Sequence, residues 1–295
     1  MSSRNISFSW IIFAYIAACS SGLLYLEFCN QPNLLINSFI ADLIATAVIF
    51  VFSRLFKNSS FYDAYWSVIP PLFLLYWWNT PGNDGQPLRY LFISVVVWFW
   101  AMRLTWNWAK HWPGLQHEDW RYELLRKKAP KMEIFTDFFG IHFFPTIQVF
   151  LGMLPMYAAV RLSEKSIGIL DYLALFTGIS AVLIQLISDR QLHQFIATRK
   201  DGDIIQHGLW GWSRHPNYFG EFLFWCSLGL FGLAAYPAGW WWEIPGAIAM
   251  LCMFLFASIP LMETRSLERR PQYQKIINNI SMFIPWPPKK VQRKT

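Results

Sequence analysis

Long runs of apolar residues alternate with short polar segments along this 295-residue chain. Each run has about 20 residues, the length that an α-helix needs to cross the hydrocarbon core of a bilayer. We therefore expect an all-α integral membrane protein, a bundle of about eight (seven to eight) transmembrane helices. The expected spans cover residues 8–28, 35–55, 62–78, 88–108, 137–160, 167–188, 219–236 and 241–262.

The composition agrees with a membrane protein. Hydrophobic residues make up 55% of the chain and charged residues 15%, whereas soluble domains carry about 25% charged residues. The first apolar run is too long, and has the wrong flanking residues, for a cleaved signal peptide. Because no soluble segment of appreciable size remains, we expect residues 1–295 to form one polytopic domain.

The positions of the basic residues predict the topology. Most of the 25 Lys and Arg residues lie in segments that face the cytoplasm if both termini are cytoplasmic, whereas the opposite side holds only Arg89, Arg161 and Lys165. The positive-inside rule therefore favours eight spans with both termini inside. No organelle-targeting segment is visible, so we expect a bacterial inner membrane.

The net charge of +7 is mainly this topological signal, although it also favours anionic lipid headgroups. The basic residues flank spans and form no nucleic-acid recognition motif, so we expect no nucleic-acid partner. The four cysteines show no CxxC spacing, which predicts neither a disulfide framework nor a metal site. Nothing in the pattern predicts an obligate protein partner or an oligomeric state.

Several polar residues near span ends have structural interpretations. Asp63, at the start of the third span, is expected to cap that helix, with a substrate contact as the alternative. Arg103 is expected to extend toward the inner headgroups. Segment 109–136 predicts either a short amphipathic helix on the membrane surface or a solvated connector. In span five, Pro145 and Pro155 predict kinks that expose His142 to a cavity or to an interhelical hydrogen bond.

The densest polar cluster lies in the segment Gly208–Glu221, which we call the signature segment. It places Arg214, His215, Asn217, Tyr218 and Glu221 within eight positions, directly before an apolar run. Such groups at the mouth of a span are costly unless they bind something. The alternative is a ring of interfacial anchors, which explains the tryptophans but not polar residues inside the span.

Three segments on the inner side, 188–200, 208–221 and 263–273, flank consecutive spans and should lie together. Their Arg and Lys side chains suit phosphates, and the start of the seventh span, with Pro216 in its first turn, is a natural anion site. Aromatic rings can stack on a base, and acidic groups can accept from a ribose or an amide. The candidate cofactor-binding residues are Asp189, Arg199, Lys200, Trp210, Arg214, His215, Asn217, Tyr218, Glu263, Arg265, Arg269 and Tyr273.

Several motifs resemble those of the steroid 5α-reductase superfamily of membrane enzymes. They are Gly-Leu-Trp-x-x-Ser-Arg-His-Pro-Asn-Tyr-Phe-Gly-Glu at 208–221, Ser-Asp-Arg-Gln at 188–191 and the segments 260–273 and 283–288. The last two, with Asp119, Arg121 and Tyr122, are similar to an uncharacterised bacterial-type branch. The Arg-His-Pro-x-Tyr core is also similar to that of isoprenylcysteine carboxyl methyltransferases and sterol C14 and C7 reductases.

The resemblance covers residues 61–288 and leaves 1–60 as additional N-terminal helices and 289–295 as a basic tail. It implies that the last helices and inner loops hold NADPH, with Asp189, Arg199, Asn217 and Glu221 matching cofactor-binding residues of the steroid enzymes. One departure is Asp203, which falls where those enzymes have an arginine.

The favoured function is an NADPH-dependent membrane reductase that transfers hydride to a polarised carbon–carbon double bond of a hydrophobic, steroid- or lipid-like substrate. The candidate proton donors are Tyr218, His142 and Glu221. Candidate substrate contacts are Asp63, Trp66 and Trp100. The alternatives are a methyltransferase that uses S-adenosylmethionine on a lipid-linked substrate, and a non-catalytic membrane protein that binds a lipid or a partner.

Overall fold

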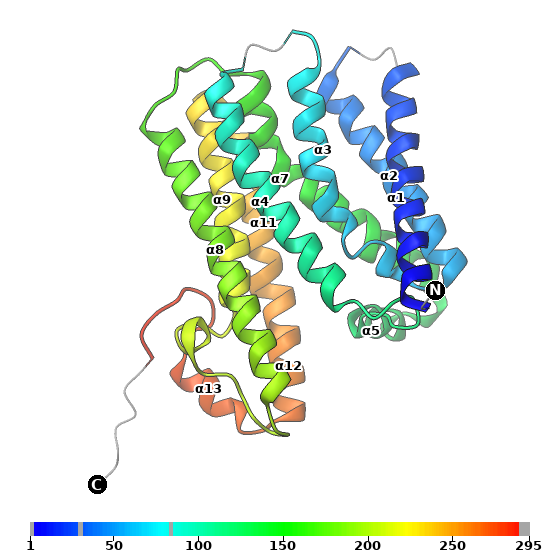
Figure 1. Ribbon diagram of the computed structural model, residues 1–295, viewed down its shortest axis with the longest axis vertical. Coiled ribbons are helices and arrows are strands. Elements are labelled where there is room, and N and C mark those ends of the chain that lie inside the picture. Colours follow the sequence, from blue (N-terminus) through cyan, green and yellow to red (C-terminus); the bar gives the residue numbers. More distant parts are fainter. Residues whose placement is uncertain (1–2, 29–31, 83–84, 289–295) are drawn as a thin grey trace.

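The computed structural model describes residues 3–28, 32–82 and 85–288 and is nearly all helical, as the sequence predicts (Figure 1). The α-helices are α1 (Ser3–Phe28), α2 (Leu34–Phe56), α3 (Tyr65–Asn79), α4 (Pro87–His111), α5 (Trp120–Lys128), α6 (Glu133–Phe135), α7 (Phe144–Arg161), α8 (Ile169–Thr198), α9 (Pro216–Ala235), α10 (Trp240–Glu243), α11 (Pro245–Met253), α12 (Ile259–Arg269) and α13 (Tyr273–Asn279). Short 3₁₀ or π segments are η1 (Ser59–Phe61), η2 (Pro130–Met132), η3 (Thr136–Phe143), η4 (Gly208–Gly211), η5 (Pro237–Gly239) and η6 (Phe254–Ser258). The expected basic tail, 289–295, lies outside the described residues.

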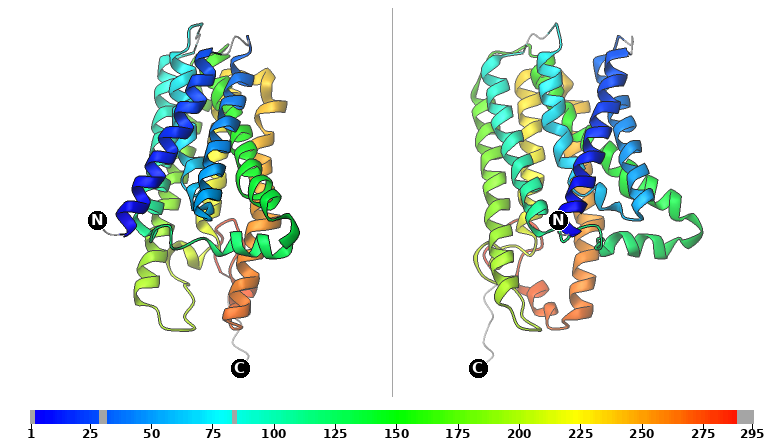
Figure 2. Two further views of the ribbon diagram at one scale, coloured as in Figure 1. Left: turned by 90° about the vertical axis from the view of Figure 1, so that its right-hand side faces the viewer. Right: turned by 45° about the vertical axis from the view of Figure 1, so that its right-hand side comes forward.

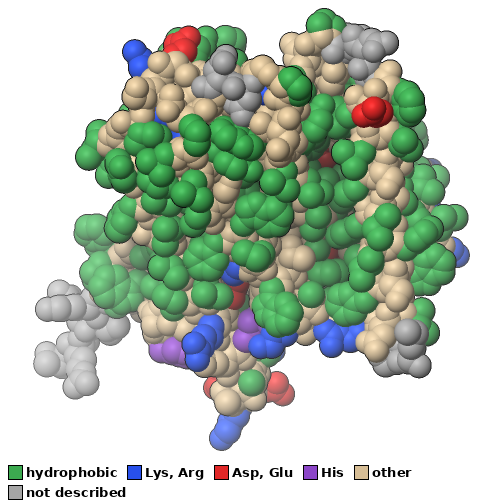
Figure 3. Space-filling model, turned by 45° about the horizontal axis from the view of Figure 1, so that its top comes forward, with side chains coloured by type: hydrophobic (Ala, Val, Ile, Leu, Met, Phe, Trp, Pro, Cys, Tyr) green, Lys and Arg blue, Asp and Glu red, His purple; other side chains and the backbone are tan. Residues whose placement is uncertain are grey.

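Within the described residues, seven helical segments are long and apolar enough to cross a membrane. The third expected span, α3, has 15 residues and is therefore only about 22 Å long. It nevertheless runs between the two ends of the bundle, antiparallel to α2 and α4 (Figure 1). The predicted number of about eight thus corresponds to seven full-length helices and one short one. The chain is a multi-pass membrane protein with an apolar surface, and Lys and Arg side chains gather along the lower edge of the face in Figure 3.

Local sequence signals set several helix boundaries. Pro87 and Pro216 occupy the first turns of α4 and α9, where a missing N–H costs no hydrogen bond. The side chains of Asn33 and Asp119 cap α2 and α5. The predicted distortion near Pro145 is present, because the chain forms the π segment η3 directly before it.

The site end of the bundle is the end where α4 and α8 finish and α9 begins. There α8 and α9 pack closely, because Gly220 presents no side chain to its neighbour. A Cβ at Gly220 would lie 2.7 Å from Cγ of Gln185 and 2.9 Å from the carbonyl oxygen of Ala181. This close approach brings Gln185 beside Glu221, the residue that follows Gly220.

At the opposite end, Arg89 on α4 is completely buried and ties four segments together. Its Nε lies 2.6 Å from a carboxylate oxygen of Asp171 on α8, and its guanidinium also donates to Ser163 and to the carbonyl oxygens of Lys165 and Ala234. The sequence analysis assigned Arg89 to a segment on the side opposite the cytoplasm. In the structure Arg89 forms an ion pair that joins helices at the end of the bundle remote from the site.

Candidate functional site

The signature segment begins with a left-handed turn at Gly208, where φ is +59°. A Cβ there would lie 2.1 Å from the side-chain amide of Gln191 on α8, so a larger residue would have to displace that amide and adopt a strained backbone conformation. Two hydrogen bonds then attach the segment to α8: the Leu209 N–H donates to Gln191 Oε1 over 3.0 Å, and the Trp210 indole donates to the Ser188 carbonyl over 3.0 Å. Trp210, a predicted cofactor residue, is therefore held against α8 near the site end.

Residues 280–286, which we call the C-terminal strap, pair with the signature segment. The Ser213 hydroxyl donates to the Phe283 carbonyl over 2.7 Å, and the Arg214 N–H donates to the Ser281 carbonyl over 2.8 Å. The Trp286 N–H donates in turn to the Trp212 carbonyl over 3.0 Å. The strap thus fixes the backbone of the signature segment just before α9 begins.

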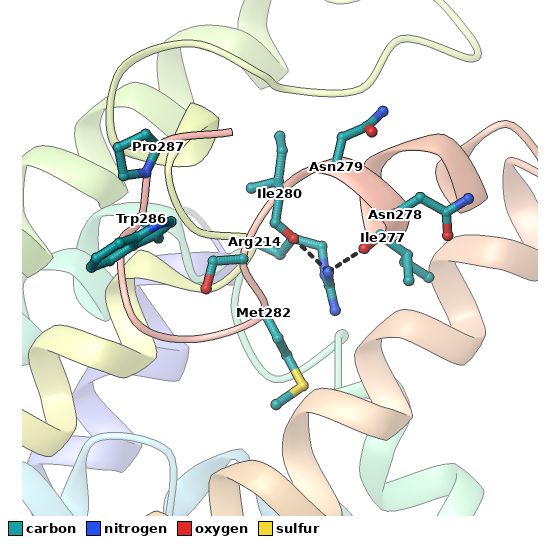
Figure 4. A pocket seen from close by; sticks show the side chains of 9 residues that line it. Arg214, Ile277, Asn278, Asn279, Ile280, Met282, Trp286 and Pro287 are labelled. Atoms are coloured by element: carbon teal, nitrogen blue, oxygen red, sulfur yellow. Dashed lines mark hydrogen bonds between the residues drawn. The ribbon is translucent and has the colours of Figure 1, made fainter. Parts of the chain in front are cut away.

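Three predicted cofactor residues form one ionic group beneath the strap. Arg214 Nε lies 2.6 Å from Glu263 Oε1, and His215 Nε2 lies 3.2 Å from the same oxygen. Arg214 also donates to the carbonyls of Ile277 and Ile280 (Figure 4). Its guanidinium borders a pocket of about 340 Å³ that Met282, Trp286 and Pro287 also line. Because most of its donors are occupied by protein groups, Arg214 shapes this pocket and orients Glu263.

Glu221, a predicted catalytic and cofactor residue, is the centre of a second group. Its carboxylate is buried and accepts from the indoles of Trp100 and Trp225 and from Gln185 Nε2, at 3.0–3.1 Å. Arg103 Nη2 lies 3.8 Å away. The side chains that contact the carboxylate, Trp100, Trp225, Gln185 and Arg103, all present donors to it.

Arg103 connects Glu221 with Asp189. Its Nη1 donates to Asp189 Oδ2 over 2.6 Å, and the Arg103 side chain is only 6% exposed. The interpretation that Arg103 extends into the headgroups is therefore wrong: a carboxylate partner on α8 retains it inside the bundle. Asn107 extends the chain of contacts from Asp189 to His193, which stacks on His111 at the surface.

Two polar atoms beside this group are buried and have no hydrogen-bond partner within the described residues: Gln185 Oε1 and Arg103 Nε. The orientation of the Gln185 amide is fixed, because its NH₂ must face the Glu221 carboxylate, an acceptor. The side chains that approach Glu221 Oε2 therefore carry one free acceptor and one free donor. Buried polar atoms of this kind require a partner, and a carboxamide supplies both an acceptor and a donor.

The predicted substrate residues Trp66 and Trp100 lie together beside Glu221. Their ring centroids are 5.5 Å apart in an edge-to-face arrangement, and Trp100 stacks on Phe224 at 4.3 Å. Trp100 is completely buried, whereas Trp66 is half-buried. An apolar aromatic wall thus adjoins the polar group around Glu221.

Asp63 takes part in a third group, at the start of α5. The Tyr122 hydroxyl donates to Asp63 Oδ1 over 2.6 Å, and Ala64, not Asp63, occupies the N-cap of α3, so the interpretation of Asp63 as a helix cap is wrong. Burial raises the pKa of Asp63 to about 6, against the lowering effect of the Tyr122 hydrogen bond. The pair therefore holds a carboxyl group that can be protonated near neutral pH.

Arg121 and Asp119 lie next to this pair. Burial raises the pKa of the Asp119 carboxyl, but the bidentate contact with Arg121, at 2.9 Å on each side, outweighs burial and lowers it overall. Burial alone would lower the pKa of Arg121, yet Asp119 raises it, and Tyr122 and Tyr218 act in the same direction. Tyr218 on α9 is thus within electrostatic reach of α5.

Arg265 on α12 also contacts the start of α5. Its guanidinium carbon lies 3.6 Å from the ring centroid of Trp120 on α5, a cation–π contact. Tyr218 stacks between His215 and Phe254, with centroid distances of 5.5 and 5.0 Å. Segment 109–136 therefore does contain a helix, and its start adjoins α9 and α12.

The other predicted residues lie elsewhere or are exposed. Arg199, Lys200 and Arg269 are exposed at the site end, and Asn217 and Tyr273 are half-buried there. Nearby groups raise the pKa of Tyr273 to about 12, burial first and the Glu263 carboxylate next. His142 is buried among α2 and η3: its Nε2 lies 2.9 Å from the Ser53 hydroxyl and its Nδ1 2.8 Å from the Asp137 carbonyl.

Sequence reasoning did not select Gln185, Trp225, Arg103 or Tyr122 as site residues. Gln185 and Trp225 lie within apolar runs, where the sequence gives no reason to distinguish a single amide or indole from residues that only pack in the core. One signal was available for Gln185: it lies four positions before Asp189, on the same helix face. Tyr122 was noted only as part of a family resemblance, because nothing local to α5 reveals that Asp63 lies opposite.

Comparison with known proteins gives a family but no described activity. No solved structure matches the chain. One curated relative is the uncharacterized protein C594.04c of Schizosaccharomyces pombe, which is 25% identical over 285 residues that cover 88% of this chain and 82% of the relative. Residues 49–280 match the model of a family described as protein of unknown function (DUF1295). Because residues 49–280 are well over half of this chain, the chain belongs to the DUF1295 family.

Proposed function

We propose that this protein is a membrane reductase that binds NADPH at the site end and transfers hydride to a polarised carbon–carbon double bond of a hydrophobic, steroid- or lipid-like substrate. The observation that carries the proposal is the pair of unpartnered buried atoms, Gln185 Oε1 and Arg103 Nε, on two side chains that approach the Oε2 atom of Glu221. A nicotinamide carboxamide has the acceptor and the two donor hydrogens that complement them. The resemblance of the signature segment to steroid 5α-reductases supports the same ligand.

Residues at the site end suit the rest of the cofactor. Arg199, Lys200 and Arg269 are exposed cations that can bind phosphates. Trp286, 70% exposed at the edge of the Figure 4 pocket, offers a ring face for a base. The bound cofactor would supply the hydride, and the protein would position the acceptor and exclude water.

The contacts distinguish among the three predicted proton donors. Both oxygens of Glu221 and both ring nitrogens of His142 are occupied by protein partners. Within the described residues the Tyr218 hydroxyl has no hydrogen-bond partner, so it remains free to donate. The Asp63–Tyr122 pair is a further candidate, since both residues are half-buried and Asp63 lies three residues before Trp66.

Thermal stabilisation of the detergent-purified protein tests the proposal. NADPH, NADP⁺ and S-adenosylmethionine are compared side by side, because a ligand that binds only the folded state raises its stability by about 2.7 kcal/mol at 100 times Kd. We expect both nicotinamide forms to raise the melting temperature. No shift with either form at millimolar concentration refutes the reductase proposal, and a shift with S-adenosylmethionine alone favours the methyltransferase. The bacterial inner membrane stays a prediction.

A further inference from the structure

Residues 120–139, which we call the α5 arm, project sideways from the bundle. The arm contains α5, η2, α6 and the start of η3, and the right-hand view of Figure 2 shows it projecting to one side of the bundle near the level where α1 begins and α2 ends. Spans that begin and end at one level mark the boundary between hydrocarbon and headgroups. The arm therefore lies at the interfacial level of the membrane.

The carboxylates of the arm, and Glu118 just before it, are already paired with protein cations. Arg126 pairs with Glu118 and Asp137 at 2.6 Å, and Arg54 pairs with Glu133 and Asp137 at 2.9 and 2.6 Å. Glu123 is 2.7 Å from Lys127 on the same helix. These contacts hold the arm against the end of α2 and leave no carboxylate there to balance additional cations.

Three lysines near these ion pairs have no partner within the described residues. Lys128 and Lys131 are exposed on the arm, and Lys57 is exposed at the end of α2, three residues after Arg54. Apolar side chains next to the arm lysines are also exposed: Met132 at 55%, Ile134 at 58% and Phe135 at 58%. Free cations beside exposed apolar groups are typical of segments that lie in a membrane interface with anionic lipids.

We propose that the α5 arm is a docking surface for anionic phospholipids, whose headgroup phosphates bind Lys57, Lys128 and Lys131 while Met132, Ile134 and Phe135 enter the acyl region. The charge complementarity selects anionic over zwitterionic lipid, because the acids of the arm are all paired. The same arm carries Tyr122, which contacts Asp63, so lipid binding would also fix one wall of the site. The inference does not rest on the reductase proposal.

The test uses the full-length protein in a neutral detergent with added phosphatidylglycerol, phosphatidylcholine or inorganic phosphate. We expect phosphatidylglycerol to raise the melting temperature and the other two to have little effect. From the typical attraction of one basic residue to an anionic surface, each of Lys128→Gln and Lys131→Gln should raise the concentration needed for half of the shift about fivefold, and the double variant about 25-fold.

Lys165→Gln is the matched control, since it removes one exposed lysine at the opposite end and should leave the response unchanged. The double replacement by arginine keeps the charge and should preserve the response, which separates charge from folding. Equal stabilisation by both lipids, a full response of the double glutamine variant, or an effect of inorganic phosphate as large as that of the lipid overturns the proposal.

Discussion

Replacing Glu221 by Gln isolates the role of its charge with almost no change in shape. The carboxylate accepts from Trp100, Trp225 and Gln185, and the amide can accept at only one of its two terminal atoms. Gln185 must then rotate so that its oxygen faces the new NH₂. This rotation removes the free acceptor, Gln185 Oε1, that we assign to the cofactor carboxamide.

The magnitude follows from the hydrogen bonds involved. Hydrogen bonds to a charged group contribute about 1.5–3 kcal/mol and neutral ones about 1 kcal/mol, so three weakened bonds reduce stability by about 1.5–6 kcal/mol, less the desolvation that the buried charge no longer incurs. Loss of one ligand hydrogen bond of about 1 kcal/mol should weaken NADP⁺ binding by about fivefold or more.

The assay measures the melting temperature and the NADP⁺ affinity by the quenching of tryptophan fluorescence. Glu243→Gln is the matched control, because Glu243 is also fully buried but neither of its oxygens has a partner in the described structure. We expect the control to bind NADP⁺ normally and to be at least as stable as the wild type. If Glu221→Gln matches the wild type in both measurements, or if the control weakens NADP⁺ binding equally, the reasoning about the Glu221 group is wrong.

Three further predictions concern the fold and the third group. The pKa of Asp63 is raised to about 6 in the folded protein, above its value of 3.8 in the unfolded chain. Its contribution to stability is therefore complete below pH 3.8 and is lost as the pH rises through 6. We expect the melting temperature of Asp63→Asn to rise relative to that of the wild type between pH 5 and pH 8, whereas that of Asp201→Asn, an exposed control, should not. Gly208→Ala should lower the melting temperature strongly, because φ is +59° and Gln191 occupies the space of a Cβ, whereas Gly140→Ala, with nothing within 4 Å, should not; equal effects of the two would contradict the role of the turn. Arg89→Ala leaves Asp171 buried without its partner and should cost about 3–5 kcal/mol in chemical unfolding, with NADP⁺ affinity unchanged in the protein that remains folded.

The sequence predicted the helices well because each apolar run must satisfy its own backbone hydrogen bonds in a membrane. It was less accurate at the ends: α8 continues to Thr198, past the expected end at residue 188, because polar residues can extend a helix beyond the bilayer. The short α3 also differs, since η1 and a turn occupy residues 59–64 at its start.

The site was predictable where its residues are adjacent in sequence and not where they meet through packing. The signature segment supplies Arg214, His215 and Glu221 together, and the structure joins the first two to Glu263 as expected from neighbouring segments. The partners of Glu221 on α4 and α8 depend on the approach of α9 at Gly220, a tertiary contact. Arg103 was misinterpreted for the same reason, because its partner Asp189 lies 86 positions away.

The C-terminal strap also bears on the order in which the protein is made. The signature segment donates hydrogen bonds to the carbonyls of Ser281 and Phe283 and accepts one from the Trp286 N–H. These three residues leave the ribosome after all the membrane helices. Insertion of the bundle into the membrane can therefore precede completion of the site, and the signature segment has all of these hydrogen bonds only when synthesis has passed residue 286. A chain that stops short of the strap would be a membrane-inserted protein with an unfinished site.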